Sequence, residues 1–294
     1  MNKKLLIILI STLCIFVMLL NSCSNQSAAS QDTQKPQQSS NALERETSDT
    51  YIKPANEYPK QTEAPESTPA EKTVSLEVNG EKYTAQYESS EYNQYNNLKY
   101  NKYSDGDNTF EIYEDSNTLK DFNLYSKDGH QKKTFEECKQ VAIDYARQFI
   151  SVDDYKFTFQ EATANVSLHF FDFTRYIDDT PTDDTLGMAM NTDGEILSFW
   201  FNYSEAFSDG DFDINKVRSD IEYFKSKEVH DELDGIAKSI KNYSSHQYFS
   251  NHLVSLGGKE YGLEYVINVD TREKNSDGTF SGSGECLTYV VTRK

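Results

Sequence analysis

Four aspartates have the spacing of a calcium-binding loop. Asp209, Asp211, Asp213 and Asp220 stand at places 1, 3, 5 and 12 of one run, and these places supply oxygen ligands in such loops. Place 6 is normally glycine because the chain turns sharply there, but here it is Ile214. We therefore favour an acidic loop that ends with Asp213 capping a helix, and calcium binding is the alternative. No other cofactor is expected.

A second acidic cluster flanks Pro181 and comprises Asp178, Asp179, Asp183 and Asp184. It predicts either a solvated loop or a weak calcium site. Paired carboxylates also catalyse glycoside hydrolysis when they face each other across a cleft at roughly 5 to 10 Å. The sequence contains no His-Glu-x-x-His pattern, no Gly-x-Ser-x-Gly elbow and no P-loop. We therefore expect a protein without enzymatic activity.

Tyrosine is the second residue type that could bind a ligand. Five tyrosines lie close together among Asn and Gln residues: Tyr87, Tyr92, Tyr95, Tyr100 and Tyr103. If their rings share one surface, they form a platform for a sugar or a peptide. Tyrosine is also a good strand former, so the alternative is a sheet that uses tyrosine on both faces.

The cysteines indicate an exported protein. Cys14 lies in the apolar N-terminal segment, Cys23 follows it, and only Cys138 and Cys286 remain. No Cys-x-x-Cys spacing occurs, which argues against zinc and thioredoxin chemistry. A disulfide between Cys138 and Cys286 would suit an oxidising compartment. We prefer a buried thiol at Cys138, on the apolar side of a predicted helix, because nothing in the sequence places the two cysteine side chains together.

The N-terminal residues have the pattern of an export signal. Lys3 and Lys4 precede an apolar run over residues 5–20, and small residues follow it. The run is shorter than the roughly 20 residues that a membrane-spanning helix requires. We therefore predict a signal peptide over residues 1–22, and an uncleaved anchor helix is the alternative.

Leu20-Asn21-Ser22-Cys23 resembles the lipobox of bacterial lipoproteins. The resemblance implies cleavage before Cys23 and a lipid on its sulfur, with acyl chains such as palmitate. Two or three such chains hold a soluble domain on a bilayer, at about 0.8 kcal/mol per buried methylene. We expect the protein on the extracytoplasmic face of the bacterial cell membrane, anchored by lipid.

The charge balance argues against nucleic acid as a partner. The chain has 29 Lys and Arg against 48 Asp and Glu, a net charge of -19. Nucleic-acid binding requires a basic surface, and anionic lipid attracts polybasic segments. We therefore expect membrane attachment through the lipid on Cys23 rather than through a charged patch.

Composition divides the chain into parts. Residues 23–72 are rich in Ser, Gln, Thr, Pro and Glu and show no apolar periodicity, which predicts a disordered linker behind the lipidated cysteine. The folded part begins near residue 73. We expect a first α+β part over residues 73–203 and a second over residues 204–294.

Turn and cap residues predict the elements within these parts. Asn79-Gly80 and Thr192-Asp193-Gly194-Glu195 indicate hairpin turns between alternating strands. Thr134 and Glu137 form a capping box ahead of an amphipathic helix over residues 135–150. Asp213 precedes a second helix, and a third carries Leu233 to Ile240. The predicted fold is α+β, with antiparallel β-meanders each packed against a helix.

One unit of this pattern resembles a known family. The helix after Thr134, the strand with Phe173-x-Arg175-Tyr176, and the hairpin from Met190 to Phe199 look like the PepSY-type units of secreted bacterial proteins, including the YcdB/YcdC-type repeats. A weaker copy lies over residues 100–125, so the resemblance covers roughly residues 98–203. It implies a non-catalytic domain that in some members regulates proteases at the cell envelope, and it supplies no catalytic residues.

Three hypotheses follow from these patterns. The leading one is a non-enzymatic lipoprotein whose PepSY-like units bind an envelope protein or regulate a protease, which predicts an exposed sheet face or edge. The alternative is a lipoprotein that binds cell-wall glycan or a solute through its Tyr-rich surface, which predicts a Tyr-lined groove. A carboxylate hydrolase would require two acids facing each other across a cleft.

Overall fold

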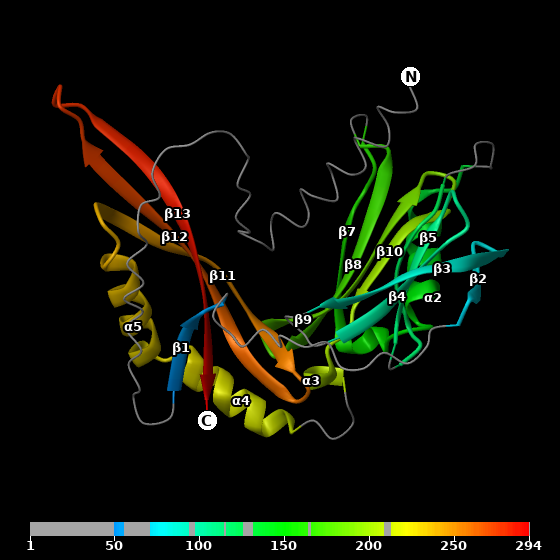
Figure 1. Cartoon of the computed structure of the whole chain (residues 1–294), viewed down its shortest axis with the longest axis horizontal. Coiled ribbons are helices and arrows are strands. Elements are labelled where there is room, and N and C mark those ends of the chain that lie inside the picture. Colours follow the sequence, from blue (N-terminus) through cyan, green and yellow to red (C-terminus); the bar gives the residue numbers. More distant parts are fainter. Residues whose placement is uncertain are drawn as a thin grey trace.

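The computed structural model describes residues 50–55, 71–93, 98–114, 116–125, 132–163, 166–208 and 213–293. The predicted signal peptide, Cys23 and most of the predicted linker lie outside the described residues, as do Tyr95, Asp209 and Asp211. The described chain forms two lobes, and in each lobe helices accompany a sheet (Figure 1).

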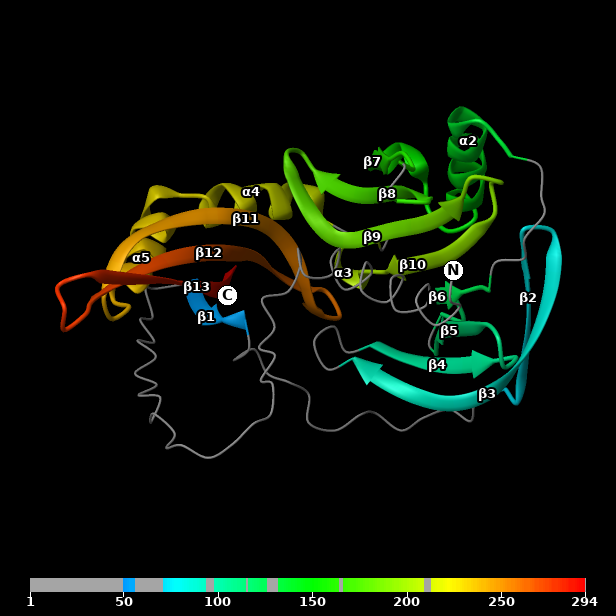
Figure 2. The same cartoon turned by 90° about the horizontal axis from the view of Figure 1, so that it is seen from above.

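The first lobe packs helix α2 against a curved antiparallel sheet (Figure 2). Phe122, Phe171 and Phe199 of the sheet pack with Cys138 and Ala142 of α2 in one apolar core. In chain order the elements are β2 (Thr73–Val78), β3 (Glu81–Asn93), β4 (Leu98–Ser104), β5 (Thr109–Tyr113), β6 (Leu119–Asn123), α2 (Phe135–Ala146), the short 3-10 helix η2 (Val152–Asp154), β7 (Tyr155–Gln160), β8 (Leu168–Ile177), β9 (Thr180–Asn191) and β10 (Ile196–Asn202).

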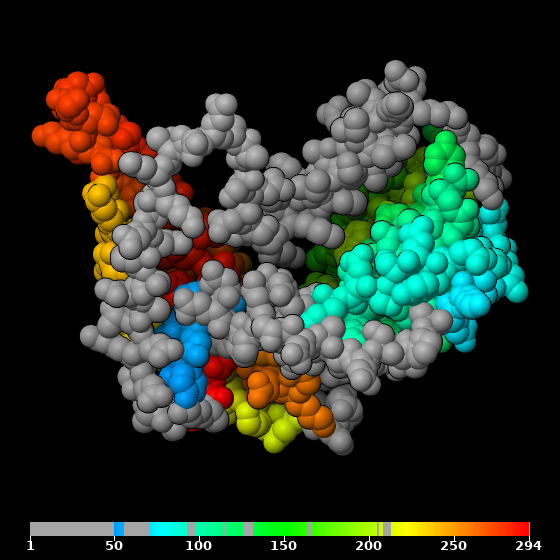
Figure 3. All heavy atoms as spheres, viewed as in Figure 1, coloured from blue at the N-terminus to red at the C-terminus, as the bar shows by residue number. Residues whose placement is uncertain are grey.

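The second lobe packs two main helices on a three-stranded meander with one added strand. Phe224, Leu233, Tyr265 and Ile267 are fully or almost fully buried members of its separate apolar core. Its elements are β1 (Thr50–Pro54), α3 (Glu205–Ser208), α4 (Ile214–Phe224), α5 (Lys227–Lys238), β11 (Tyr243–Gly257), β12 (Glu260–Lys274) and β13 (Phe280–Arg293). The β12–β13 hairpin projects beyond the helices, as Figure 3 also shows.

The two lobes share one mixed sheet of 13 described strands. The strand order is β1-β13-β12-β11-β9-β10-β6-β5-β4-β3-β2, and β8, which also carries β7, pairs with β9 outside this path. All neighbours are antiparallel except β9 and β11, which meet in parallel at Thr182 and Leu253. The predicted α+β class is confirmed, with the sheet as the dominant element.

The predicted local signals formed as expected, except that α5 ends at Lys238, short of Ile240, and the helix after Thr134 is also shorter than predicted. Thr134 Oγ1 accepts from the Glu137 backbone N–H at 3.3 Å, and the Glu137 carboxylate accepts from the Thr134 N–H at 2.7 Å, which completes the capping box. The helix ends at Ala146 rather than at residue 150. The next turn tightens, with the Phe149 N–H bonded to the Ala146 carbonyl, and its ring packs 4.8 Å from Phe199.

The structure corrects the prediction for one stretch inside the predicted linker. Residues 50–54, which the composition assigned to a disordered segment, form β1 and pair with β13 in antiparallel register. Ile52 packs against the second core, and Thr50 Oγ1 is hydrogen-bonded to Tyr223 OH. Backbone pairing with the edge of β13 and the packing of Ile52 therefore stabilise a strand in this segment despite its polar composition.

The predicted repeat over residues 100–125 and 173–203 is not shown. The strands β4, β5 and β6 follow one another directly, whereas α2 precedes the meander β7 to β10. A helix followed by an antiparallel meander does occur again in the second lobe, where α4 and α5 precede β11 to β13.

Candidate functional site

The turn between β9 and β10 is built by its own side chains. Asn191 Oδ1 accepts from the backbone N–H groups of Asp193 and Glu195 at 3.0 and 2.9 Å. The Asn191 amide also donates to the Glu195 carboxylate at 2.8 Å. Gly194 adopts a φ of +80°, which glycine accommodates without strain. These contacts explain why the residues that resemble a PepSY-type turn form a rigid hairpin.

The β2–β3 hairpin is joined to this turn by the side chain of Asn79. Asn79, which turns the chain between β2 and β3 with a φ of 55°, donates to the Ile196 carbonyl and accepts from the Ile196 N–H, both at 3.0 Å. The Asn79 amide therefore makes the pair of hydrogen bonds that a backbone residue of a neighbouring strand would make, and it holds β2 and β3 in place relative to β10.

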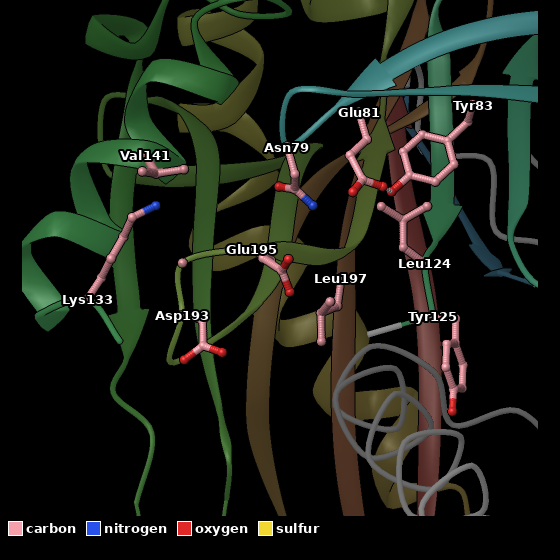
Figure 4. A pocket seen from close by; sticks show the side chains of 11 residues that line it. Asn79, Glu81, Tyr83, Leu124, Tyr125, Lys133, Val141, Asp193, Glu195 and Leu197 are labelled. Atoms are coloured by element: carbon pink, nitrogen blue, oxygen red, sulfur yellow. Dashed lines mark hydrogen bonds between the residues drawn. The ribbon is translucent and has the colours of Figure 1, made fainter. Parts of the chain in front are cut away.

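A shallow pocket of about 270 Å³ lies where these two turns meet α2. Figure 4 shows Glu81, Asp193 and Glu195 around it with Lys133, and Val141, Leu124 and Leu197 among the other lining side chains. Carboxylates outnumber amines here, so the pocket is acidic. Its lining residue Tyr125 is the last described residue before a gap in the described chain, and we assign the pocket no ligand.

Among the described strands, β2 ends the sheet in the first lobe, and its outer edge pairs with none of them. The Tyr87 N–H donates to the Lys72 carbonyl at 3.0 Å, so the even-numbered residues of β2 are the ones that bond to β3. The backbone groups of Thr73, Ser75 and Glu77 consequently point away from β3. In the strand order of the described chain no strand lies beyond β2. In Figure 3 the β2–β3 hairpin, coloured cyan, lies at the surface at one end of the molecule.

The face of the first sheet opposite α2 carries a row of directly opposed residues. Asp172 on β8 lies opposite Gly187 on β9, Gly187 lies opposite Trp200 on β10, and Trp200 lies opposite Asp121 on β6. The row continues through Glu111 and Lys102 to Ser89. Trp200 is the single tryptophan of the chain and is partly exposed.

The indole of Trp200 lies over the backbone of Gly187. A Cβ placed on Gly187 would stand 2.1 Å from Cε2 of the indole, and only slightly farther from Cζ2 and Nε1, at 2.2 and 2.4 Å. Such nearly equal distances mean that the face of the ring, rather than its edge, covers the glycine. An isolated glycine in an apolar strand is a sequence signal for such close approach, but it does not reveal which side chain approaches.

The two aspartates of this row differ in their surroundings. Burial raises the pKa of Asp172 to about 6. Burial and the nearby Glu111 raise the pKa of Asp121 to about 7, against the opposing effect of Lys120 and Lys102. Asp121 also accepts a hydrogen bond of 3.0 Å from Asn123. Within the described part of the chain, no hydrogen bond or ion pair reaches the side-chain carboxyl of Asp172.

A second group of titratable residues lies where the lobes meet. Asp183 on β9 accepts a hydrogen bond of 2.8 Å from the Ser255 N–H on β11. Burial is the main reason that the pKa of Asp183 rises to about 7, and burial together with the charge of Asp183 raises the pKa of Glu264 on β12 to about 7. His252 Nε2 lies 3.6 Å from Glu264 Oε1, but burial lowers the pKa of His252 to about 4, so it brings no positive charge at neutral pH.

The predicted acidic cluster around Pro181 divides into two parts. Asp178 has a φ of 53° in the turn between β8 and β9 and pairs with Arg218 at 3.0 Å. Asp183 and Asp184 instead belong to β9. Asp184 is fully buried and accepts from Tyr155 OH at 2.9 Å and Arg175 Nε at 3.0 Å. The interpretation as one solvated loop is therefore wrong for its second half.

The helix-cap interpretation of the calcium-like run is confirmed for its described members. Asp213 caps α4 by accepting from the backbone N–H groups of Asn215 and Lys216. Asp220 is held by Lys216 Nζ, Tyr261 OH and Arg293 at 2.8, 2.6 and 3.2 Å. Burial would raise the pKa of Asp220, but these hydrogen bonds outweigh it and lower the pKa. No group of three or more metal-binding side chains occurs within the described residues.

The predicted tyrosine platform is distributed over two faces of the sheet. Tyr103 is only 4% exposed in the first core, and Tyr87 packs edge-on against it at 5.9 Å. Tyr100 lies on the face of Trp200, where its hydroxyl donates to Glu91 at 2.7 Å. Tyr92 lies opposite Lys99 and so faces the other way from Tyr100. Alternation along β3 and β4 therefore separates rings that are close in sequence.

The preferred state of Cys138 is confirmed. Its thiol is free and buried in the core of the first lobe, and burial raises its pKa. Cys138 therefore does not pair with Cys286. Among the helices of the described residues, none is long and apolar enough to span a membrane.

Comparison with known proteins gives little further information. No protein-family model matches the chain, and no curated protein matches it. Among solved structures, the chain is similar to the Bacillus megaterium YpeB C-terminal domain with 10% sequence identity and a TM-score of 0.28. The similarity covers 65% of this chain and 83% of that one. At that TM-score, the likeness supports no argument about function.

Proposed function

We propose that this protein is a membrane-anchored extracytoplasmic lipoprotein without enzymatic activity, whose PepSY-like folded part binds a protein partner, such as a protease, at the cell envelope. The lipid on Cys23 and the location are proposed from the pattern Leu20 to Cys23. The binding role rests on one observation, the free edge of β2.

An extended segment of a partner would fit this edge as an added strand. Its backbone would bond to the outward N–H and C=O groups of Thr73, Ser75 and Glu77, which is the mode called β-augmentation. Val74 and Leu76 are half-buried beside the edge and pack against the first core. A partner strand with alternating apolar residues would extend that core on one face and remain solvated on the other.

A proline at Ser75 tests the edge without disturbing the existing ladder. The Ser75 N–H points away from β3, so the Ser75→Pro variant removes a donor that β3 does not use. The matched control is Ser75→Ala, which removes the hydroxyl and its 3.4 Å contact with Thr84 but keeps the N–H. Each full-length form, in detergent, is immobilised and exposed to solubilised envelope and secreted proteins of the host.

We expect the wild type and Ser75→Ala to retain the same saturable partner, and Ser75→Pro to bind it at least ten-fold more weakly with an unchanged circular dichroism spectrum. If the partner is a protease, we expect its activity to fall on binding. Equal retention by all three forms would exclude the edge as the binding surface. Retention on purified wall glycan, without any protein partner, would replace the proposal with the glycan-binding alternative.

A further inference from the structure

The face of the first sheet that carries Trp200 already holds two lysines over aromatic rings. Lys156 Nζ lies 3.7 Å from the centre of the Tyr176 ring, and Lys120 Nζ lies 4.1 Å from the centre of the Tyr100 ring. Both tyrosines share this face: Tyr100 is two residues along β4 from Lys102, and Tyr176 contacts Lys156, which lies opposite Thr174, two residues along β8 from Asp172. Cation–π attraction is therefore a recurrent contact on this face.

Trp200 has the ring with the strongest attraction for a cation, yet within the described chain no cation lies over it and its indole N–H makes no hydrogen bond. One face of the indole covers Gly187, so the other face is directed away from the sheet. On β9 and β10 the residues that flank the indole on this face are small or neutral, with Ala189 and Ser198 on one side and Thr185 and Asn202 on the other, and Phe170 of β8 lies opposite Ala189. The flanking side chains on β9 and β10 are too short to cover the indole.

A carboxyl group lies on each side of this ring. Asp172 is opposite Gly187, which the indole covers, and Asp121 is opposite Trp200 itself. Directly opposed side chains have Cβ atoms about 4.5 to 5.5 Å apart, so a group stacked on the indole would be within reach of Asp172. The carboxyl of Asp172 has no partner within the described chain.

We propose that Trp200 and Asp172 form a binding site for a basic side chain, an arginine or lysine, of the protein partner. The planar guanidinium of arginine would stack on the indole and bond to the Asp172 carboxylate at the same time. The net charge of -19 favours the approach of a basic segment. The partner itself rests on the proposed function, whereas the capture of a cation by Trp200 is measurable without any partner.

Because Trp200 is the single tryptophan, its fluorescence reports on this site specifically. The full-length protein in detergent at pH 8 is titrated with acetyl-Thr-Arg-Thr-amide and with acetyl-Thr-citrulline-Thr-amide, which has nearly the same shape without the charge. Chitotriose tests a neutral glycan. We expect a saturable change with the arginine peptide, and at least ten-fold weaker binding of the other two probes.

Two variants assign the site. We expect Asp172→Asn and Trp200→Leu each to weaken binding of the arginine peptide about ten-fold, measured by calorimetry because the second variant lacks the fluorophore. Asp153→Asn, an exposed acid in η2, removes the same charge elsewhere and should leave the affinity unchanged. Equal affinity for the arginine and citrulline peptides, preferential binding of chitotriose, or wild-type affinity in Asp172→Asn would overturn the proposal.

The two proposals can fail separately. Ser75→Pro leaves the Trp200 face intact, so we expect it to bind the arginine peptide like the wild type while it loses the protein partner. A partner that is captured normally by Asp172→Asn and Trp200→Leu would overturn the basic-side-chain site only. Binding of the arginine peptide without any captured partner would overturn the proposed function only.

Discussion

The acids at the junction of the lobes give the protein a stability that depends on pH. Burial and the charge of Asp183 raise the pKa of Glu264 from its ordinary value of 4.5 to about 7. The folded state therefore holds this proton more tightly than the unfolded chain does. The stability that this group contributes is fully present below pH 4.5 and is lost as the pH rises through about 7.

The magnitude follows from the same values. The rise from 4.5 to about 7 corresponds to about 3 kcal/mol of destabilisation once Glu264 is ionised. Between pH 5 and pH 8 the wild type should lose about 2 kcal/mol through this group, because part of the change occurs below pH 5. The side chain of Glu264 is 17% exposed, so solvent screening reduces this cost only moderately.

The substitution Glu264→Gln removes the charge and nearly keeps the shape. We expect the variant to be about 3 kcal/mol more stable than the wild type at pH 8 and about 1 kcal/mol more stable at pH 5. Urea unfolding of the full-length protein, followed by circular dichroism at both pH values, measures the difference. The control is Glu260→Gln, an exposed glutamate of the same strand, which should show the pH dependence of the wild type.

One result would refute this account. If Glu264→Gln loses as much stability between pH 5 and pH 8 as the wild type does, the junction does not disfavour the ionised form of the Glu264 carboxyl. The pH dependence would then come from other buried acids, such as Asp183, whose pKa burial also raises to about 7.

Three further predictions concern single positions. Gly187→Ala should push the indole of Trp200 off the sheet, since a Cβ there would lie 2.1 Å from Cε2. We expect red-shifted tryptophan emission and a loss of about 1 to 3 kcal/mol in the free energy of unfolding, measured with urea. The control is Gly284→Ala, where a Cβ would meet no atom within 4 Å. Unchanged emission from Gly187→Ala would contradict the stacking of the indole on Gly187. Asp213→Ala removes the cap of α4 and should cost about 1 kcal/mol in the same assay, whereas Asp213→Asn should be nearly neutral. Cys23→Ser should abolish incorporation of labelled palmitate and release the protein from the membrane fraction, and retained label would disprove lipidation at Cys23.

Local signals were sufficient where the interacting residues are neighbours in the chain. The capping box of Thr134 and Glu137, the Asn79-Gly80 turn and the Asp213 cap depend on contacts within a few residues, so the sequence predicted them correctly. The helix end after Ala146 was missed because the packing of Phe149 on Phe199, residues 50 positions apart, tightens the last turn. The β1 strand was missed because its partner, the edge of β13, lies at the other end of the chain.

The candidate sites depend on contacts of much longer range. Asp172, Gly187 and Trp200 come from three strands, and only the register of β8, β9 and β10 brings them into one row. Alternation likewise separated Tyr87 and Tyr103 from Tyr100, although they are close in sequence. A shift of the register by one residue would move each side chain to the opposite face, so no local pattern could decide which residues meet.

The sequence by itself determined the acidic charge and the sheet-rich α+β class, which follow from its composition and its patterns. It also determined the caps and the turns, because their hydrogen bonds join residues that are close to one another in the chain. The lipobox-like segment also belongs to the sequence, and its lipidation stays a prediction. Only the tertiary structure decided that the Asp183 carboxylate bridges two lobes, that β2 ends the sheet with a free edge and that an indole covers Gly187. Each of these depends on strand order and register, which are fixed by the packing of two apolar cores rather than by any one segment.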